Sequence, residues 1–250
     1  MHILVTNDDS IHSPGLLALA QAMREFGKVS ILAPNRNWSG GGHVKTMTRP
    51  LRVYEHVLED GTPALSSDGA PSDCVALAML GVIKEPIDFV VSGINTTPNM
   101  GHDVTYSGTV TAVMEAVVGG ITGIAVSQEE GNPQIHEMAN YVAKKVMQQV
   151  IDHRLPKGVF LNVNVPNVTV KDLKGIQLTR QGLRVYHSRL DERDDPRGKK
   201  YYWIAGDKPG GVPEDGTDIG ALDSGYASVT PLQLDLTAHG KLVGWNWTMK

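Results

Sequence analysis

The sequence predicts an α/β fold, in which a mostly parallel sheet is flanked by helices and a smaller C-terminal part carries a protruding hairpin or arm. Two observations predict the sheet and its helices. Short apolar segments typical of buried strands alternate with segments whose apolar residues recur at helical spacing. Strands separated by helices pair in parallel and place helices on both faces of the sheet. A third observation predicts the C-terminal part, because the alternation stops at about Val168.

Five strands and four helices are expected in the first two thirds of the chain. The first helix illustrates the argument, because Pro14 suits the first helical turn and Gly27 suits the end of a helix. Between them Leu16, Leu19 and Met23 recur at the spacing of one buried helix face. By the same criteria, strands are expected at residues 3–5, 29–32, 89–91, 124–126 and 160–165, and the later helices at 71–80, 109–118 and 134–151.

The C-terminal part differs in character from the segments before it. Residues 191–200 form a run of mixed charge, and residues 201–204 read Tyr-Tyr-Trp-Ile. This pattern indicates a hairpin or arm that packs on a partner subunit, and a solvated surface loop is the alternative.

Composition narrows the classes of function. The chain has 23 basic and 27 acidic residues among 250, and a net charge of −4 argues against a nucleic-acid surface, which needs clustered Lys and Arg. One cysteine, Cys74, excludes an internal disulfide, and its helical context predicts a packed side chain. The first apolar run is too short for a signal peptide or a membrane span, so we expect a cytoplasmic protein with no membrane contact.

Three long loops follow predicted strands, at residues 7–13, 34–45 and 93–106. In open α/β sheets, ligands bind outside the carboxyl ends of the strands. We therefore expect the three loops to meet at one rim that carries the chemistry.

The first loop begins with Asp8 and Asp9, which could hold a cation if the chain turns there. Two adjacent aspartates also suit an ordinary turn or helix cap, and alone they favour that interpretation. The second loop contains Gly40, Gly41 and Gly42, which permit close backbone approach to a ligand. It lacks the spacing of a phosphate-binding P-loop, and a flexible surface loop is the alternative.

The third loop leads into Ser107, Gly108 and Thr109, which open the next predicted helix. Free backbone N–H groups at a helix start favour an anion, and Ser or Thr there is also an ordinary cap. Carboxylate, hydroxyl and amide oxygens at this rim favour Mg²⁺ or Mn²⁺ over zinc. Of the nine histidines, His43 and His102 lie in these loops and are kept as candidate site members.

Several motifs in a fixed order resemble the SurE family, the survival-protein nucleotidases that remove phosphate from nucleoside 5′- and 3′-monophosphates. The resemblance covers most of residues 1–128 and 216–237 and is thinner between. The matching motifs are Ile3-Leu4-Val5-Thr6-Asn7-Asp8-Asp9, Pro34 with Ser39-Gly40, Val91-Ser92-Gly93-Ile94-Asn95 with Asn99, Gly101 and Asp103, Tyr106-Ser107-Gly108-Thr109-Val110, Met114-Glu115-Ala116, Thr217-Asp218, Gly225-Tyr226 and Ser228-Val229-Thr230-Pro231-Leu232.

The resemblance implies a site that the residues alone do not fix. One divalent ion, Mg²⁺ or Mn²⁺, would be held in each subunit by Asp8, Asp9, Ser39 and Asn95. The phosphate or the rest of the substrate would be bound by a second set of residues, Gly40, Asn99, Ser107, Gly108 and Thr109.

The resemblance also implies the organisation of the chain. Residues 1–167 would form a Rossmann-like catalytic core. Residues 168–250 would form an oligomerisation part with the arm, which returns to the core at about 216–237. Exchange of arms would make a homodimer or tetramer.

The sequence departs from the family pattern at three places. Ser10 replaces the glycine that usually follows the two aspartates, and Thr97-Pro98 replaces the usual glycine after Asn95. His102 stands where an acid is common. None of these changes removes a predicted ligand, but they alter the shape of the loops.

The function expected from these features is metal-dependent hydrolysis of nucleoside monophosphates, in which a water molecule attacks the phosphorus. Asp8 and Asp9 are the expected catalytic residues, and Asp9 is a guess for the general base.

Two alternatives remain open. One is a phosphatase with an aspartyl-phosphate intermediate on Asp8, although such enzymes usually space their acids as Asp-x-Asp. The other is a metal-dependent nucleotide-binding module without turnover. A sugar-nucleotide transferase is less favoured, because no acceptor site is visible.

Overall fold

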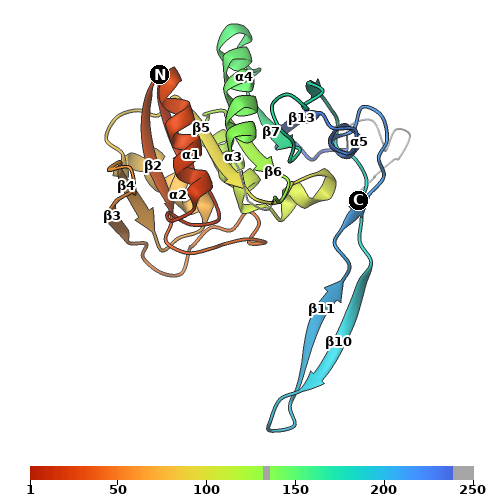
Figure 1. Cartoon of the computed structure of the whole chain (residues 1–250). Helices are drawn as coiled ribbons and strands as arrows, with labels where there is room; N and C mark the ends of the chain where they lie inside the picture. The colour runs from red at the N-terminus through yellow and green to blue at the C-terminus, as the bar shows by residue number, and fades with distance from the viewer. Residues whose placement is uncertain (132–135, 239–250) are drawn as a thin grey trace, which may run out of the picture.

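A computed structural model describes residues 1–131 and 136–238. Its centre is a nine-stranded sheet with the strand order β3-β4-β2-β1-β5-β6-β7-β13-β8 (Figure 1). Its strands are β1 (His2–Thr6), β2 (Lys28–Pro34), β3 (Val53–Val57), β4 (Pro63–Ser67), β5 (Phe89–Asn95), β6 (Gly123–Gln128), β7 (Val159–Val165), β8 (Ile176–Leu178) and β13 (Ala227–Gln233).

The sheet is mostly parallel, as the sequence predicted. Strand β1 pairs in parallel with β2 and β5, and the parallel series continues through β6 and β7. Two pairs are antiparallel, β3 with β4 and β13 with β7. The fold class is therefore confirmed as α/β.

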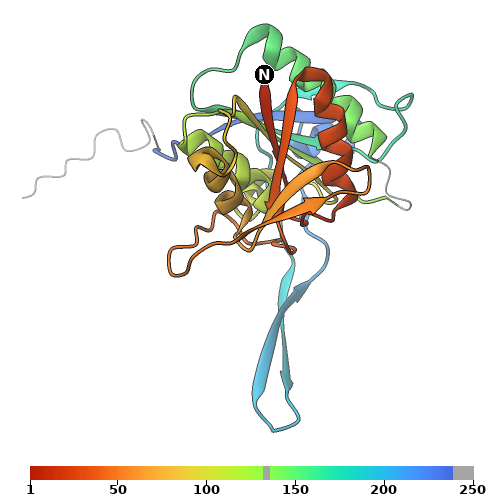
Figure 2. The same cartoon turned by 90° about the vertical axis from the view of Figure 1, so that its left-hand side faces the viewer.

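Helices cover both faces of the sheet (Figures 1 and 2). Alternate residues of β1 point to opposite faces, so Ile3 and Val5 pack with α1 (Pro14–Met23) and α4 (Glu137–His153), whereas Leu4 packs with the other two helices. Those are α2 (Pro71–Leu77) and α3 (Gly108–Val118). Cys74 is fully buried in the second core, which confirms that it is a packed residue.

Most predicted elements differ from the structure by one or two residues at their ends, and larger differences concern three of them. The α-helical part of α2 stops at Leu77 and continues as a π-helical turn to Val82, in which Gly81 has a φ of 110°. Strand β5 extends to Asn95 and so includes the first residues of the expected third loop. Helix α4 begins at Glu137, and residues 134 and 135 of the predicted helix lie outside the described residues.

The hairpin of β3 and β4 was not predicted from the sequence. Residues of β3 such as Glu55 and Val57 are exposed on this edge of the sheet, so the segment lacks the apolar run of a buried strand. Propensity is a weak guide for such a half-buried edge strand.

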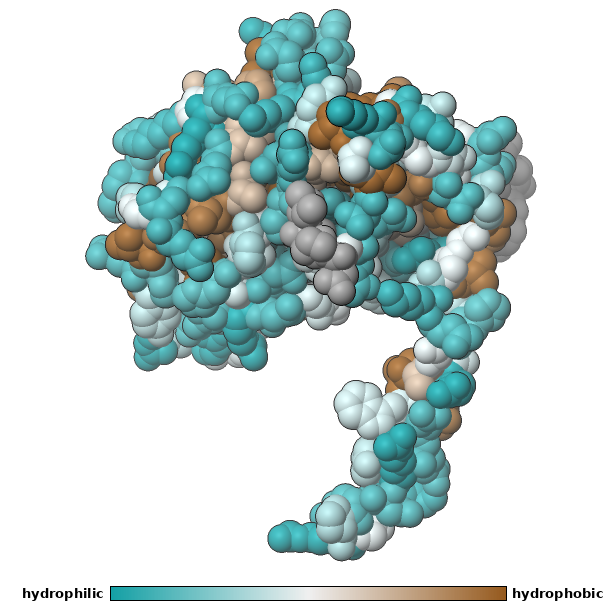
Figure 3. Space-filling view, in the orientation of Figure 1, coloured by the Kyte–Doolittle hydropathy of each residue, from teal (hydrophilic) through white to brown (hydrophobic). Residues whose placement is uncertain are grey.

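The predicted arm is a long hairpin of β10 (Ser188–Asp194) and β11 (Lys200–Gly206), which projects away from the body of the molecule (Figure 1). Its surface is mostly hydrophilic, with hydrophobic patches nearest its root (Figure 3). Near the root lie the pair β9 (Arg184–Val185) with β12 (Gly210–Gly211) and helix α5 (Asp218–Asp223). The hairpin is confirmed, whereas its contact with a partner stays a prediction.

The division at residue 167 also stays a prediction, and part of its C-terminal side, residues 239–250, lies outside the described residues. Strand β13 from that side is an inner strand of the main sheet. Within the described ranges, none of the helices combines the length and the apolar character needed to cross a lipid bilayer.

Candidate active site

Strand β1 delivers Asn7, Asp8 and Asp9 to the carboxyl edge of the sheet, where the chain turns. The Asn7 side-chain amide donates to the Ser10 carbonyl at 2.9 Å and closes this turn. Ser10 has a φ of 95°, a conformation that glycine adopts without steric cost and other residues adopt rarely. Glycine, which the family resemblance predicts at this position, would therefore adopt the turn more easily than Ser10.

Asp8 is packed against the start of α3. Its side chain is 3% exposed, and its Oδ1 accepts a hydrogen bond from the Thr109 hydroxyl. A Cβ atom added at Gly108 would lie 2.6 Å from the Asp8 Cβ, so only glycine fits there. Burial raises the pKa of Asp8, although hydrogen bonds from the Thr109 hydroxyl and nearby backbone groups oppose the rise.

Asp9 is more accessible than Asp8 but has fewer partners. The Asn37 amide lies 3.4 Å from its Oδ1, and its buried Oδ2 has no hydrogen-bond partner among the described residues. Burial, and then the charge of Asp8, raise the pKa of Asp9 to about 6. Two adjacent carboxylates with an unpaired oxygen form an environment that a cation would stabilise, so these residues fit a metal ion.

The second loop lies against the first and the third. The Trp38 N–H donates to the Asp8 carbonyl at 2.8 Å, and the Gly42 N–H donates to the Tyr106 carbonyl at 2.9 Å. Ser39 lies between these two fixed points, and its side chain is exposed. These bonds confirm that the three loops meet at one rim, and Gly40, with a φ of 75°, adopts a turn that favours glycine.

Glu115 on α3 anchors the far end of the second loop. Its carboxylate is 8% exposed and receives the Lys45 ammonium at 2.6 Å and the His43 imidazole at 3.1 Å. His43 therefore lies in the site loop, as predicted, but the structure pairs it with Glu115.

The third loop starts from Asn95 at the end of β5. The Asn95 amide nitrogen donates to the Thr97 carbonyl at 2.5 Å, which leaves its oxygen as an acceptor. Asn99 is held by the strands beside it, because its amide donates to Ser127 and its carbonyl accepts from Asn162 and Asn164. These bonds fix the backbone of the loop next to β6 and β7.

The C-terminal part holds the same loop from the other side. Asp103 receives the Arg184 guanidinium at 2.5 Å and the Tyr186 hydroxyl. The Gly101 N–H donates at 2.9 Å to Asp218, which is fully buried at the start of α5. The root of the arm and the third loop are thus one connected structure.

The helix start uses its side chains for structure. The Ser107 hydroxyl accepts from the Val110 N–H at 3.1 Å and caps α3, and the Thr109 hydroxyl is bound to Asp8. A phosphate at this position would therefore meet the backbone of Gly108 and Thr109 and the dipole of α3. His102 is exposed in the turn that follows Met100.

The structure brings Asp8, Asp9, Gly108 and Thr109 together through these contacts. Ser39 and Asn95 lie on the adjoining loops, and within residues 1–131 and 136–238 no hydrogen bond joins either of them to an aspartate. The four-residue ligand set and the substrate contacts stay predictions.

Several residues that shape the rim were not predicted from the sequence to have a role there. Glu115, Asp103 and Asp218 lie in the motifs that carry the family resemblance, but no spacing rule assigns them partners. Arg184 and Tyr186 carry no such signal, because their partner Asp103 is more than 80 residues away in the sequence.

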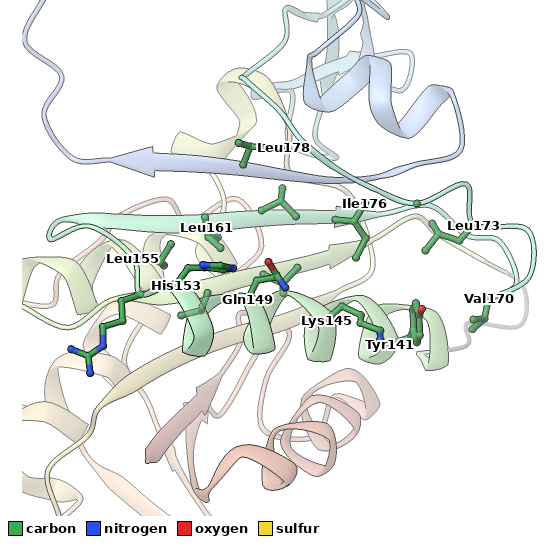
Figure 4. A pocket seen from close by; sticks show the side chains of 15 residues that line it. Tyr141, Lys145, Gln149, His153, Leu155, Leu161, Val170, Leu173, Ile176 and Leu178 are labelled. Carbon is green, nitrogen blue, oxygen red and sulfur yellow. The ribbon is translucent and has the colours of Figure 1, made fainter.

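An apolar pocket of about 810 Å³ lies elsewhere, between α4 and strands β7, β13 and β8 (Figure 4). Residues such as Leu161, Ile176 and Leu178 line it, with Lys145 and His153 at its border. It lacks the carboxylates of the rim, so the rim is the candidate active site.

Comparisons with known proteins show the family of the chain. The family model described as Survival protein SurE matches residues 3–188. The chain is 48% identical to a 5′-nucleotidase SurE of Chloroflexus aggregans, over 99% of this chain and 100% of that protein. It is 45% identical to the 5′-nucleotidase SurE of Geobacter sulfurreducens, over 97% of this chain and 91% of that protein.

A solved structure gives the same result. The crystal structure of the SurE protein from Aquifex aeolicus superposes with a TM-score of 0.84 at 41% identity, covering 97% of each chain.

Proposed function

Because the chain belongs to the SurE family, we propose that it is a metal-dependent phosphomonoesterase that hydrolyses nucleoside 5′- and 3′-monophosphates to nucleoside and phosphate. The observation that carries the proposal is the pair of buried Asp8 and half-buried Asp9, with an unpaired Asp9 oxygen, next to the start of α3. The names of the relatives support the 5′ activity, and the 3′ activity rests on the family resemblance.

Asp8, Asp9, Ser39 and Asn95 would hold one Mg²⁺ or Mn²⁺. Their oxygens are hard ligands that suit either ion. When bound, such an ion polarises a phosphoryl group and lowers the pKa of a water molecule. Among the described residues no cluster of three or more His, Cys, Asp and Glu side chains could hold a metal, and the proposed set needs only two carboxylates.

The chain's own residues supply position and charge. The N-terminus of α3, at Gly108 and Thr109, faces Asp8 and favours the negative charge of a phosphoryl group. Gly40 and Asn99 would border the substrate from the second and third loops. Asp9 is proposed as the general base, and the carboxylate oxygen that does not bind the ion would accept the proton of the attacking water.

Release of phosphate from 5′-AMP and 3′-AMP tests the proposal. Purified protein is assayed with excess chelator and then with added Mg²⁺ or Mn²⁺. We expect no measurable turnover with chelator and recovery with metal, for both esters. Full turnover in chelator would contradict the metal requirement, and binding without turnover would favour a nucleotide-binding module.

The alternative route through an aspartyl-phosphate on Asp8 predicts an acyl phosphate that can be trapped. Asp8 is nearly inaccessible to solvent, which favours direct attack by water. Borohydride added during turnover reduces an acyl phosphate and would convert residue 8 to homoserine. Direct attack by water leaves Asp8 unchanged, whereas homoserine at position 8 would support the covalent route.

The proposal extends to assembly and location. The arm exposes Leu190, Trp203 and Ile204, which supports exchange of arms in a homodimer or tetramer. A variant in which a short turn replaces residues 189–205 is expected to elute as a smaller species, and an unchanged size would contradict arm exchange. The single, buried Cys74 supports a cytoplasmic location.

A further inference from the structure

Tyr106 is an exposed aromatic residue at the rim. Its side chain is 62% exposed, but its backbone is fixed on both sides. Its N–H donates to the Asp103 carbonyl at 2.9 Å, and its carbonyl accepts from the Gly42 N–H at 2.9 Å. The ring is thus presented to solvent from a rigid position between the second loop and the start of α3.

Tyr186, from the root of the arm, approaches the same place. Its hydroxyl donates to Asp103 Oδ1, and the Arg184 guanidinium holds the other oxygen of that carboxylate. Burial, then the Asp103 hydrogen bond and charge, and also the nearby Tyr106, raise the pKa of Tyr186 to about 12. Tyr186 therefore keeps its proton at neutral pH. Both tyrosines are bound to Asp103, Tyr106 through its backbone N–H and Tyr186 through its hydroxyl.

The position of Tyr106 matches the layout of a nucleotide. Ser107 follows it directly, and Gly108 contacts Asp8. Consecutive Cα atoms are about 3.8 Å apart, so Tyr106 begins within about 8 Å of the backbone that would face the phosphate. In a nucleotide, a ribose separates the phosphate from the base. A residue that binds the base must therefore lie about one ribose away from the residues that bind the phosphate.

We propose that Tyr106 stacks on the nucleobase of the substrate and that Tyr186 lines the same wall. This inference rests on the proposed function and names the part of the substrate that the rim recognises. Every base offers a flat π-face, so stacking binds purines and pyrimidines alike. The site is therefore tolerant of the base but selective for nucleotides over phosphate esters without one.

The test compares two esters, 5′-AMP and ribose 5-phosphate, with wild type, Tyr106→Ala and Tyr106→Phe. Tyr106→Ala is expected to lower kcat/KM for 5′-AMP roughly 5- to 100-fold, the range for loss of one base-stacking contact, mainly through KM. The value for ribose 5-phosphate is expected to stay within about twofold. Tyr106→Phe keeps the π-face and should resemble wild type. Tyr54→Ala, which removes an exposed tyrosine on β3, is the matched control.

A binding measurement gives a readout that needs no turnover. The Kd of adenosine is expected to rise by the same factor in Tyr106→Ala and to stay unchanged in Tyr106→Phe. Equal losses on both esters, or unchanged adenosine binding, would overturn the stacking role. Failure of wild type to hydrolyse either ester would instead contradict the proposed function, so the two failures are distinguishable.

Discussion

The two sides of the rim are built differently. The packed side consists of Asp8, Asp9 and the start of α3 at residues 107–109, where Gly108 leaves no space for a side chain and Asp8 is almost fully buried. The loop side consists of residues 34–45, most of which are exposed, and residues 95–106, of which Met100 and Val104 are buried. It is held by separate hydrogen bonds and ion pairs. The difference suggests that the packed side fixes the chemistry and the loop side tunes substrate binding.

The largest effect is expected on the packed side, from Asp8→Asn. The substitution keeps the shape of the side chain but removes a charge that the proposed cation needs. We expect kcat to fall at least about a thousandfold, because metal stabilisation of transition-state charge is worth several kcal/mol. Phosphate release from 5′-AMP measures the loss, and circular dichroism checks that the fold is kept. A folded variant with wild-type turnover would remove Asp8 from the chemistry.

A second change on the packed side alters shape without altering charge. In Gly108→Ala the new Cβ would lie 2.6 Å from the Asp8 Cβ, so the strand end or the helix must shift. We expect kcat to fall about 10- to 100-fold, since a displacement near 1 Å can cost a factor of about a hundred. Gly210→Ala is the matched control, because its nearest atom lies 4.0 Å away. Equal activities in the two variants would show that the packed side tolerates movement.

The loop side is tested through its anchor, Glu115. In Glu115→Gln the Lys45 and His43 side chains lose a nearly buried carboxylate. We expect a loss of about 1–3 kcal/mol in the free energy of unfolding, with KM raised more than kcat is lowered. Glu85→Gln is the control, because its ion pair with Lys28 is exposed to solvent and is expected to contribute little to stability. A change in kcat with no change in KM would show that the second loop acts in the chemical step and not in substrate binding.

The smallest effect concerns the pH dependence of metal binding at Asp9. Burial and the Asp8 charge raise the pKa of Asp9 from 3.8 to about 6, so the metal-free folded state binds this proton more tightly than the unfolded chain. The protonated Asp9 carboxyl therefore stabilises the folded state fully when the pH is below the pKa of this residue in the unfolded chain. This stabilisation is lost as the pH rises through about 6, the pKa of Asp9 in the folded state. A cation replaces the proton, so Mn²⁺ should raise Tm by a few degrees more at pH 7.5 than at pH 5.

Thermal unfolding with chelator and with Mn²⁺ measures this difference. In Asp9→Asn the metal-induced rise in Tm should be small at both pH values. If Mn²⁺ raises the Tm of the wild type equally at pH 5 and at pH 7.5, Asp9 does not bind the ion.

The packed side was easier to predict from the sequence than the loop side. Asp8 and Asp9 follow an apolar run that is easy to recognise as a buried strand, and Ser107 marks a helix start by its residue type. The contacts of Asp103 with Arg184 and of Gly101 with Asp218 join residues far apart in the chain, and no local pattern encodes them. The proposed metal ligands Ser39 and Asn95 came from the family resemblance, because neither residue type nor spacing singles them out.

The place of β13 in the sheet has a consequence for synthesis of the protein. Strand β7 is complete at Val165, but its neighbour β13 begins only at Ala227. At about 5–20 residues per second, a ribosome leaves the backbone edge of β7 unpaired for several seconds while the arm is made. A nascent chain stalled in that interval would present an open strand to other chains, so aggregation should be most acute for products that end between these two strands.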